Sequence, residues 1–104
     1  MQAKAISING HPIADANGVY AHHSTHEGLP VLKNTAGIYC YRYTAADEWR
    51  LSNDQADFSR DLCNSKIATT GALPAGDHTW TCSVDGKPED HTLTTSLLVR
   101  FSPS

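Results

Sequence analysis

Short apolar runs separated by turn residues make up most of the chain. The stretch from Gly18 to Ser52 shows this most clearly, because its runs break at the glycine-containing segments Ser24–Gly28 and Asn34–Gly37. Turn signals recur about every ten residues, which is the spacing of an antiparallel meander. The sequence therefore predicts a mainly β domain.

The clearest single strand covers residues 38–43, where tyrosine alternates with other residue types. Successive side chains of a strand point to opposite faces. Tyr39, Tyr41 and Tyr43 are therefore expected on one face, with Ile38 and Cys40 on the other. Aromatic residues at period two also favour a strand over a helix.

Other segments show the same signature more weakly. Asn9–Gly10 and Asp85–Gly86 are turn signals of the kind that join paired strands. Ser52 and Gln55 fit a capping box, so one short helix is expected near residues 53–62. The further strands expected from the pattern are residues 3–8, 19–23, 29–32, 48–51, 67–70, 79–84 and 92–101.

These patterns together predict a single β-rich domain spanning residues 1–104. Its expected architecture is a small antiparallel β-sandwich or a flattened barrel of about six to eight strands. A chain of 104 residues supports one domain with a modest core. The expected inner face consists of Ile6, Ile8, Val19, Leu29, Val31, Ile38, Cys40, Trp49, Leu51, Trp80, Cys82, Val84, Leu97 and Val99.

The composition and the charge exclude several classes of protein. Hydrophobic residues make up 39% of the chain and charged residues 18%, which is too apolar for a disordered segment. No run approaches the roughly 20 apolar residues of a spanning helix, and no apolar segment follows Met1–Lys4 as in a signal peptide. The formal net charge is −3, from 8 basic and 11 acidic side chains. We therefore expect neither a membrane span nor a nucleic-acid partner.

The chain has three cysteines: Cys40, Cys63 and Cys82. Disulfide scaffolds of secreted proteins usually carry an even number at a higher density. We expect three reduced thiols, because a free cysteine behaves as a small hydrophobic residue. One disulfide with one remaining thiol is the alternative.

An ordered series of turn and core residues runs through most of the chain: Asn17–Tyr20, Gly28–Lys33, Ile38–Tyr41, Trp49–Leu51, Pro74–Gly76 and Trp80. It resembles a small uncharacterised β-domain of multidomain proteins from protists and invertebrates, over about residues 9–86. The resemblance implies a fold and no catalytic residues. Leu32 stands where that family commonly has tyrosine or phenylalanine, which should alter packing only.

Histidines gather in the segment His22–Glu27 and suggest a metal site. Neutral imidazoles bind zinc, copper or nickel well. His22 and His23 are adjacent in an expected strand and so should point to opposite faces. The metal alternative therefore rests on His23 and His26.

No motif of catalysis or of cofactor binding is present. The chain lacks a nucleophile elbow, a phosphate-binding loop, a dinucleotide fingerprint and a zinc-protease motif. We therefore expect no catalytic residues and no cofactor. A small hydrolase is a further alternative, because six histidines and 11 acidic side chains are available.

Tyrosine and histidine side chains are the best candidates for ligand contact. Tyrosine is enriched at protein interfaces and can stack on sugar rings. The leading expectation is a non-enzymatic binding or interaction module for a protein or a carbohydrate. The expected ligand-binding residues are Tyr39, Tyr41, Tyr43, His23 and His26.

Overall fold

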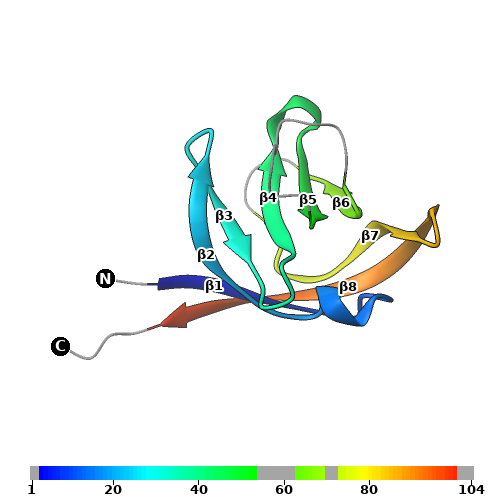
Figure 1. The fold of residues 1–104 in the computed structure, drawn as a ribbon, viewed down its shortest axis with the longest axis horizontal. Helices are drawn as coiled ribbons and strands as arrows, with labels where there is room; N and C mark the ends of the chain where they lie inside the picture. Colours follow the sequence, from blue (N-terminus) through cyan, green and yellow to red (C-terminus); the bar gives the residue numbers. More distant parts are fainter. Residues whose placement is uncertain (1–2, 54–62, 70–72, 101–104) are drawn as a thin grey trace.

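The structure is a computed structural model that describes residues 3–53, 63–69 and 73–100, with side chains over residues 5–98 of these ranges. Eight antiparallel strands form a closed barrel (Figure 1). The predicted mainly β fold is confirmed, and the barrel is the architecture. The strands are β1 (Ala3–Asn9), β2 (Gly18–His26), β3 (Leu29–Lys33), β4 (Tyr39–Tyr43), β5 (Glu48–Ser52), β6 (Ser65–Ala68), β7 (Gly76–Val84) and β8 (Lys87–Arg100).

Two short 3₁₀ turns complete the described secondary structure. They are η1 (Ala14–Ala16) and η2 (Thr44–Ala46). The helix expected near residues 53–62 falls on residues 54–62, which lie outside the described part of the chain.

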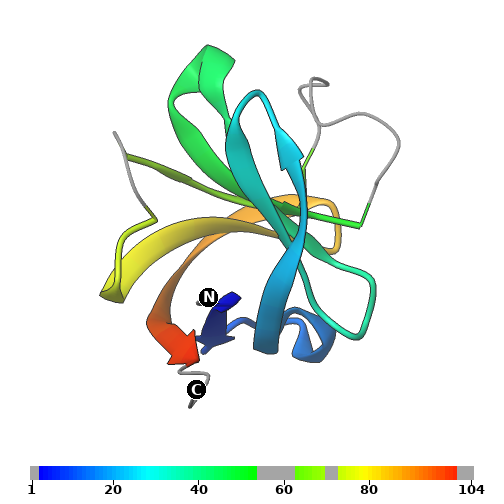
Figure 2. The same ribbon diagram turned by 90° about the vertical axis from the view of Figure 1, so that its left-hand side faces the viewer.

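Each strand pairs with its neighbour in sequence, and β8 closes the barrel by pairing with β1. β8 forms long ladders with both β7 and β1, and the hairpins β2–β3 and β4–β5 rise above it in Figure 1. Figure 2 turns the view so that the end carrying both termini faces the reader. The β3–β4 and β6–β7 ladders contain only two residue pairs each. The wall is thus least tightly joined at these two places.

Turn chemistry sets the hairpin ends. Asp85 and Gly86 join β7 to β8 with φ values of 52° and 78°, and Glu27 and Gly28 join β2 to β3 with 53° and 78°. Positive φ at both central residues is typical of the turn that matches the twist of paired strands. β2 therefore runs as far as His26, and the turn expected over Ser24–Gly28 is shorter than predicted.

Side chains fill the barrel interior. Eight strands enclose a space about wide enough for packed side chains. Trp80, Leu51, Ile8, Tyr20 and Leu93 each have 0% exposure there. The buried residues of this cluster are Ile6, Ile8, Ala16, Tyr20, Leu32, Ile38, Cys40, Trp49, Leu51, Trp80, Cys82 and Leu93.

Most of the expected inner face lies inside, but three assignments are wrong, and two of these residues are exposed. Val19 is 53% exposed and Leu97 is 60% exposed. In β2 the inward position belongs to Tyr20, whose hydroxyl donates a hydrogen bond to the carbonyl of Ala16 at 2.7 Å. Leu97 pairs with Ile6 near the end of β8, where the β1–β8 ribbon runs past the rest of the barrel (Figure 1).

Two further residues are less buried than expected, and the third wrong assignment concerns Val31. Leu29 and Val84 are half-buried, and the side chain of Val99 is outside the described set. Val31 is buried, but it belongs to a second cluster with Tyr39 and Tyr41, whereas its neighbour Leu32 joins the interior cluster. The assignment of Val31 to the interior is therefore wrong, because its neighbour Leu32 takes the interior position.

Candidate functional site

The expected ligand-binding residues lie on β2 and β4, the strands on either side of β3. Tyr39 and Tyr41 are only 2% and 1% exposed, because they pack with Val31 and the half-buried Tyr43. Cys40, between the two tyrosines, belongs to the interior cluster. β4 therefore buries both of its faces, and Tyr39 and Tyr41 are not exposed side chains.

His23 contacts this second cluster from an irregular place in β2. The pairing of β2 with β3 shifts register between His22 and Ser24, which marks a β-bulge. The exposed His23 ring meets the Tyr39 ring edge-on, with centroids 5.4 Å apart and an interplanar angle of 86°. Lys33 Nζ lies 5.2 Å from the centroid of the same ring. The structure thus brings His23 and Tyr39 together.

His26 lies at the other end of the hairpin. Its Nε2 is 3.9 Å from Oε1 of Glu27. Among the residues that the structure describes, no group of three or more histidine, cysteine, aspartate or glutamate side chains could hold a metal ion. Within those residues His23 and His26 therefore gain no third ligand of these types.

A hydrogen bond connects the tip of the β2–β3 hairpin to the tip of the β4–β5 hairpin. Thr44 Oγ1 donates to Glu27 Oε2 at 2.6 Å. Glu27 has a left-handed backbone, which is uncommon for a residue other than glycine, asparagine or aspartate. Glu27 thus belongs to the tight β2–β3 turn, and its carboxylate reaches the neighbouring hairpin. The β2–β3 and β4–β5 tips therefore form one connected edge of the barrel.

Arg50 on β5 is held in place from two sides. Its Nε and Nη2 donate to Oε1 of Glu48 at 2.9 and 2.6 Å, and its guanidinium lies 3.7 Å from the centroid of the Tyr43 ring. Burial raises the pKa of Tyr41 to about 12, and Cys63 adds to this whereas Arg50 opposes it. Arg50 is thus a fixed cation, and the Tyr41 hydroxyl keeps its proton at neutral pH.

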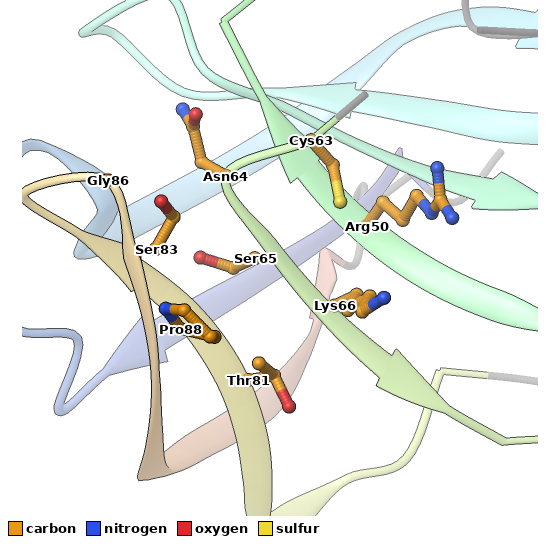
Figure 3. A pocket seen from close by; sticks show the side chains of 9 residues that line it. All are labelled: Arg50, Cys63, Asn64, Ser65, Lys66, Thr81, Ser83, Gly86 and Pro88. Carbon is orange, nitrogen blue, oxygen red and sulfur yellow. The ribbon is translucent and has the colours of Figure 1, made fainter. Parts of the chain in front are cut away.

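A pocket of about 250 Å³ lined mainly by polar residues lies beside Arg50 (Figure 3). Its lining comes from β5, from the segment before β6, from β6 itself and from the β7–β8 hairpin. Figure 3 shows Ser83 and Pro88 on the hairpin side of β6, and Arg50 and Lys66 on the other side. Lys66 pairs with Thr81 in the short β6–β7 ladder, which runs through this lining.

Strand alternation places this pocket on the outer wall. Ser65 and Cys82 are paired across the ladder and are buried. Their neighbours Lys66, Thr81 and Ser83 must then point outward, because successive side chains alternate. Most of the pocket lining therefore lies on the outer face of the wall, and the pocket also reaches the buried side chain of Ser65 at the β6–β7 ladder.

Two further contacts set the electrostatics around the pocket. Lys66 Nζ is 3.9 Å from Oε2 of Glu48, and the Lys66 side chain is 46% exposed. Thr81 Oγ1 donates to Oδ1 of Asp90 at 3.2 Å. Lys66 is thus a loosely held cation at a pocket that also presents hydroxyl groups.

A buried serine–histidine pair lies on the inner side of the same wall. The His11 loop is fixed by Asn17, which accepts from the His11 N–H at 2.8 Å and donates to its carbonyl at 3.1 Å. The N–H of Ile13 donates to His11 Nδ1 at 3.0 Å. Nε2 must then carry the proton of the neutral ring and donate to Ser65 Oγ at 2.7 Å.

This geometry does not activate Ser65 as a nucleophile. A general base must accept the serine proton, whereas His11 here donates to the hydroxyl. Both side chains are also buried, with 6% and 1% exposure. Burial and the nearby His91 lower the pKa of His11, which keeps the ring neutral. The pair acts as a structural link between the loop and β6.

None of the three cysteines, all of which the structure describes, forms a disulfide. Burial raises the pKa of Cys40 to about 12. Burial also raises the pKa of Cys82, although a hydrogen bond with Ser65 acts in the opposite direction. Both thiols are therefore held in the protonated, unreactive form, and only the half-buried Cys63 lines the outer pocket.

Comparison with known protein families, with curated proteins and with solved structures finds no match to this chain. Within its described residues, no helix is long and apolar enough to cross a membrane. The case for a function therefore rests on the geometry of the barrel.

Sequence reasoning missed the pocket residues Lys66, Thr81 and Ser83. One signal for them exists in β7, where Thr79, Thr81 and Ser83 alternate with buried or half-buried side chains. That pattern identifies a polar outer face. It does not indicate that this face meets Arg50 and Lys66, which come from strands far away in the sequence.

Proposed function

We propose that this domain is a non-enzymatic binding module that holds a small polar ligand on its outer wall. The observation that carries the proposal is the pocket over β5–β8 together with a filled interior. Trp80 and Leu51 occupy the interior at 0% exposure. The outer pocket of about 250 Å³ leaves room for a small ligand among the described residues.

The pocket size and lining indicate the ligand class. Sites for drug-sized molecules usually begin near 300 Å³, so a pocket of about 250 Å³ suits a smaller compound. Hydroxyl and amide groups of Thr81, Ser83 and Asn64 lie around it, and such groups both donate and accept hydrogen bonds. A monosaccharide or a small organic acid matches this size and chemistry. Ligands with so few atoms bind with a Kd on the order of millimolar.

Amide chemical shifts provide a direct test. Titration with monosaccharides and small organic acids should shift the amides of Lys66, Thr81 and Ser83. Thr81→Val should weaken that binding by about fivefold or more, because it removes a hydroxyl from the lining. Thr79→Val is the matched control, since Thr79 lies on the same strand but outside the pocket. Shifts centred on Trp80 in the interior would contradict the proposal.

A second candidate contact surface is the edge formed by the β2–β3 and β4–β5 tips. Thr44 and Glu27 hold these tips together at 2.6 Å, and turns on a rigid sheet often carry recognition residues. The proposed partner is a protein or a glycan that contacts His23, His26 and Tyr43. Tyr39 and Tyr41 would support this surface from beneath, because they are buried.

Single alanine variants of His23, His26 and Tyr43 test this second surface. Each should weaken capture of a partner found by glycan and protein screening. Unchanged affinity in all three variants would rule out the edge as the contact surface. The metal alternative at His23 and His26 stays a prediction, and calorimetric titration with zinc tests it.

A further inference from the structure

We propose that the ligand of the outer pocket is a small hydroxylated carboxylate, such as a uronic acid or a hydroxy acid. This inference rests on the proposed function and adds the chemical class and the residue that selects it. Among the described residues, the pocket lining contains two cations, Arg50 and Lys66, and no acidic side chain. The chain as a whole has a net charge of −3, so this part of the wall departs from the average.

The two cations have different roles. Arg50 is 2% exposed, and the Glu48 carboxylate and the Tyr43 ring hold its guanidinium. Lys66 is 46% exposed and reaches Glu48 only at 3.9 Å. An ammonium group on a flexible stem can turn toward a ligand with little loss of existing contacts. We therefore assign the ligand carboxylate to Lys66.

Nearby acidic groups limit the charge of the ligand. Glu48 contacts both cations, and Asp90 accepts a hydrogen bond from Thr81 beside the pocket. A ligand with two or more negative charges would be repelled by these carboxylates. A single carboxylate paired with Lys66 avoids that repulsion.

The rest of the lining suits hydroxyl groups. Thr81, Ser83 and Asn64 present two hydroxyls and one amide around the pocket. Ser83 and Asn64 can each donate to a ligand oxygen or accept from a ligand hydroxyl, and Thr81, whose O–H is donated to Asp90, can accept from a ligand hydroxyl. A compound with one carboxylate and several hydroxyls therefore finds a partner for each of its polar groups.

Matched ligands separate this inference from the proposed function. Glucuronate, glucose and glucosamine share one ring and differ in charge, and lactate and citrate provide open-chain acids with one and with three carboxylates. Titrations followed by calorimetry and amide shifts should rank glucuronate at least tenfold above glucose. Lactate should also shift the pocket amides, and citrate should bind more weakly than glucuronate.

Lysine variants test the assigned contact. Lys66→Gln should lower glucuronate affinity by about tenfold, because hydrogen bonds to a charged group exceed neutral ones in strength. It should lower glucose affinity much less, because glucose carries no charge for Lys66 to pair with. Lys33→Gln is the control, since Lys33 lies over Tyr39 on another part of the wall. Added salt should weaken glucuronate binding in the native chain and not in the Lys66→Gln variant.

Each other outcome contradicts a defined part of the reasoning. If glucose binds in the pocket as well as glucuronate does, the carboxylate inference fails and the binding module stands. If glucuronate binds but Lys66→Gln leaves its affinity unchanged, the assignment of Lys66 is wrong. If the ligands shift only amides outside the pocket, or none at all, both proposals fail.

Discussion

Gly10 and Gly37 offer a matched pair for testing how closely two segments of the barrel approach. Both have nearly the same positive φ, 92° and 90°. A Cβ added at Gly10 would lie 2.7 Å from the carbonyl oxygen of Thr92 on β8, whereas one added at Gly37 meets nothing within 4 Å. The two alanine variants therefore share a conformational cost and differ in one steric contact.

The expected magnitudes follow from these two terms. A left-handed backbone costs an alanine roughly 1–2 kcal/mol, partly offset by the lower entropy of its unfolded state. Gly37→Ala should therefore lower the free energy of unfolding by about 1 kcal/mol. Relieving the contact with Thr92 requires backbone movement, which adds about 1–3 kcal/mol. Gly10→Ala should lose about 2–4 kcal/mol.

Urea denaturation under reducing conditions measures both variants. The slope of the free energy of unfolding against urea should stay constant, so midpoints report the stability difference directly. If the two variants unfold within about 0.5 kcal/mol of each other, β1 and β8 do not approach as closely at Gly10 as the structure shows. That outcome would refute the reasoning.

Three further predictions concern the interior. Thr95→Val should raise the free energy of unfolding by about 1 kcal/mol in urea denaturation, because the buried Thr95 hydroxyl has no hydrogen-bond partner among the described residues. Thr94→Val, the control, loses a 2.6 Å bond to Asp77 and should not stabilise. Stability followed from pH 7.5 downward should fall below about pH 6.5, because His11 has a lowered pKa when folded and the unfolded chain takes up the proton first. A His11→Gln variant should show a smaller fall. Trp49→Ala should cost roughly 3–5 kcal/mol by denaturation, since Trp49 is 5% exposed, and a loss under about 1 kcal/mol would contradict its place in the core.

Local sequence patterns were sufficient to predict most strands of the barrel. The alternation of Trp80 and Cys82 with threonine and serine predicts both a strand and its inner face, and the structure confirms both. Asp85–Gly86 likewise forms the predicted hairpin turn. These features depend on residues close in sequence, so the sequence contains the information that fixes them.

Register errors arose where polar atoms or distant strands decide the face. Val19 is the more apolar residue of its pair, but Tyr20 lies inside because its hydroxyl finds a carbonyl partner at Ala16. Val31 and Leu32 are equally apolar, and only pairing with β2 across the bulge separates them. A single sequence does not fix such pairings, since the position of the partner strand decides which of two adjacent residues points into the barrel.

The burial of Tyr39 and Tyr41 also shows why the site could not be predicted from residue type. The sequence makes tyrosines attractive as contact residues, yet the structure uses them to pack one hairpin against the next. A strand buried on both faces, as β4 is, leaves little side-chain surface for a ligand. On β5–β7 the outward positions instead carry Arg50, Lys66 and Thr81, which line a pocket at the short β6–β7 ladder. The candidate site therefore follows from how the barrel closes, and the residues that form it become recognisable only when Lys66 and Thr81 are placed side by side.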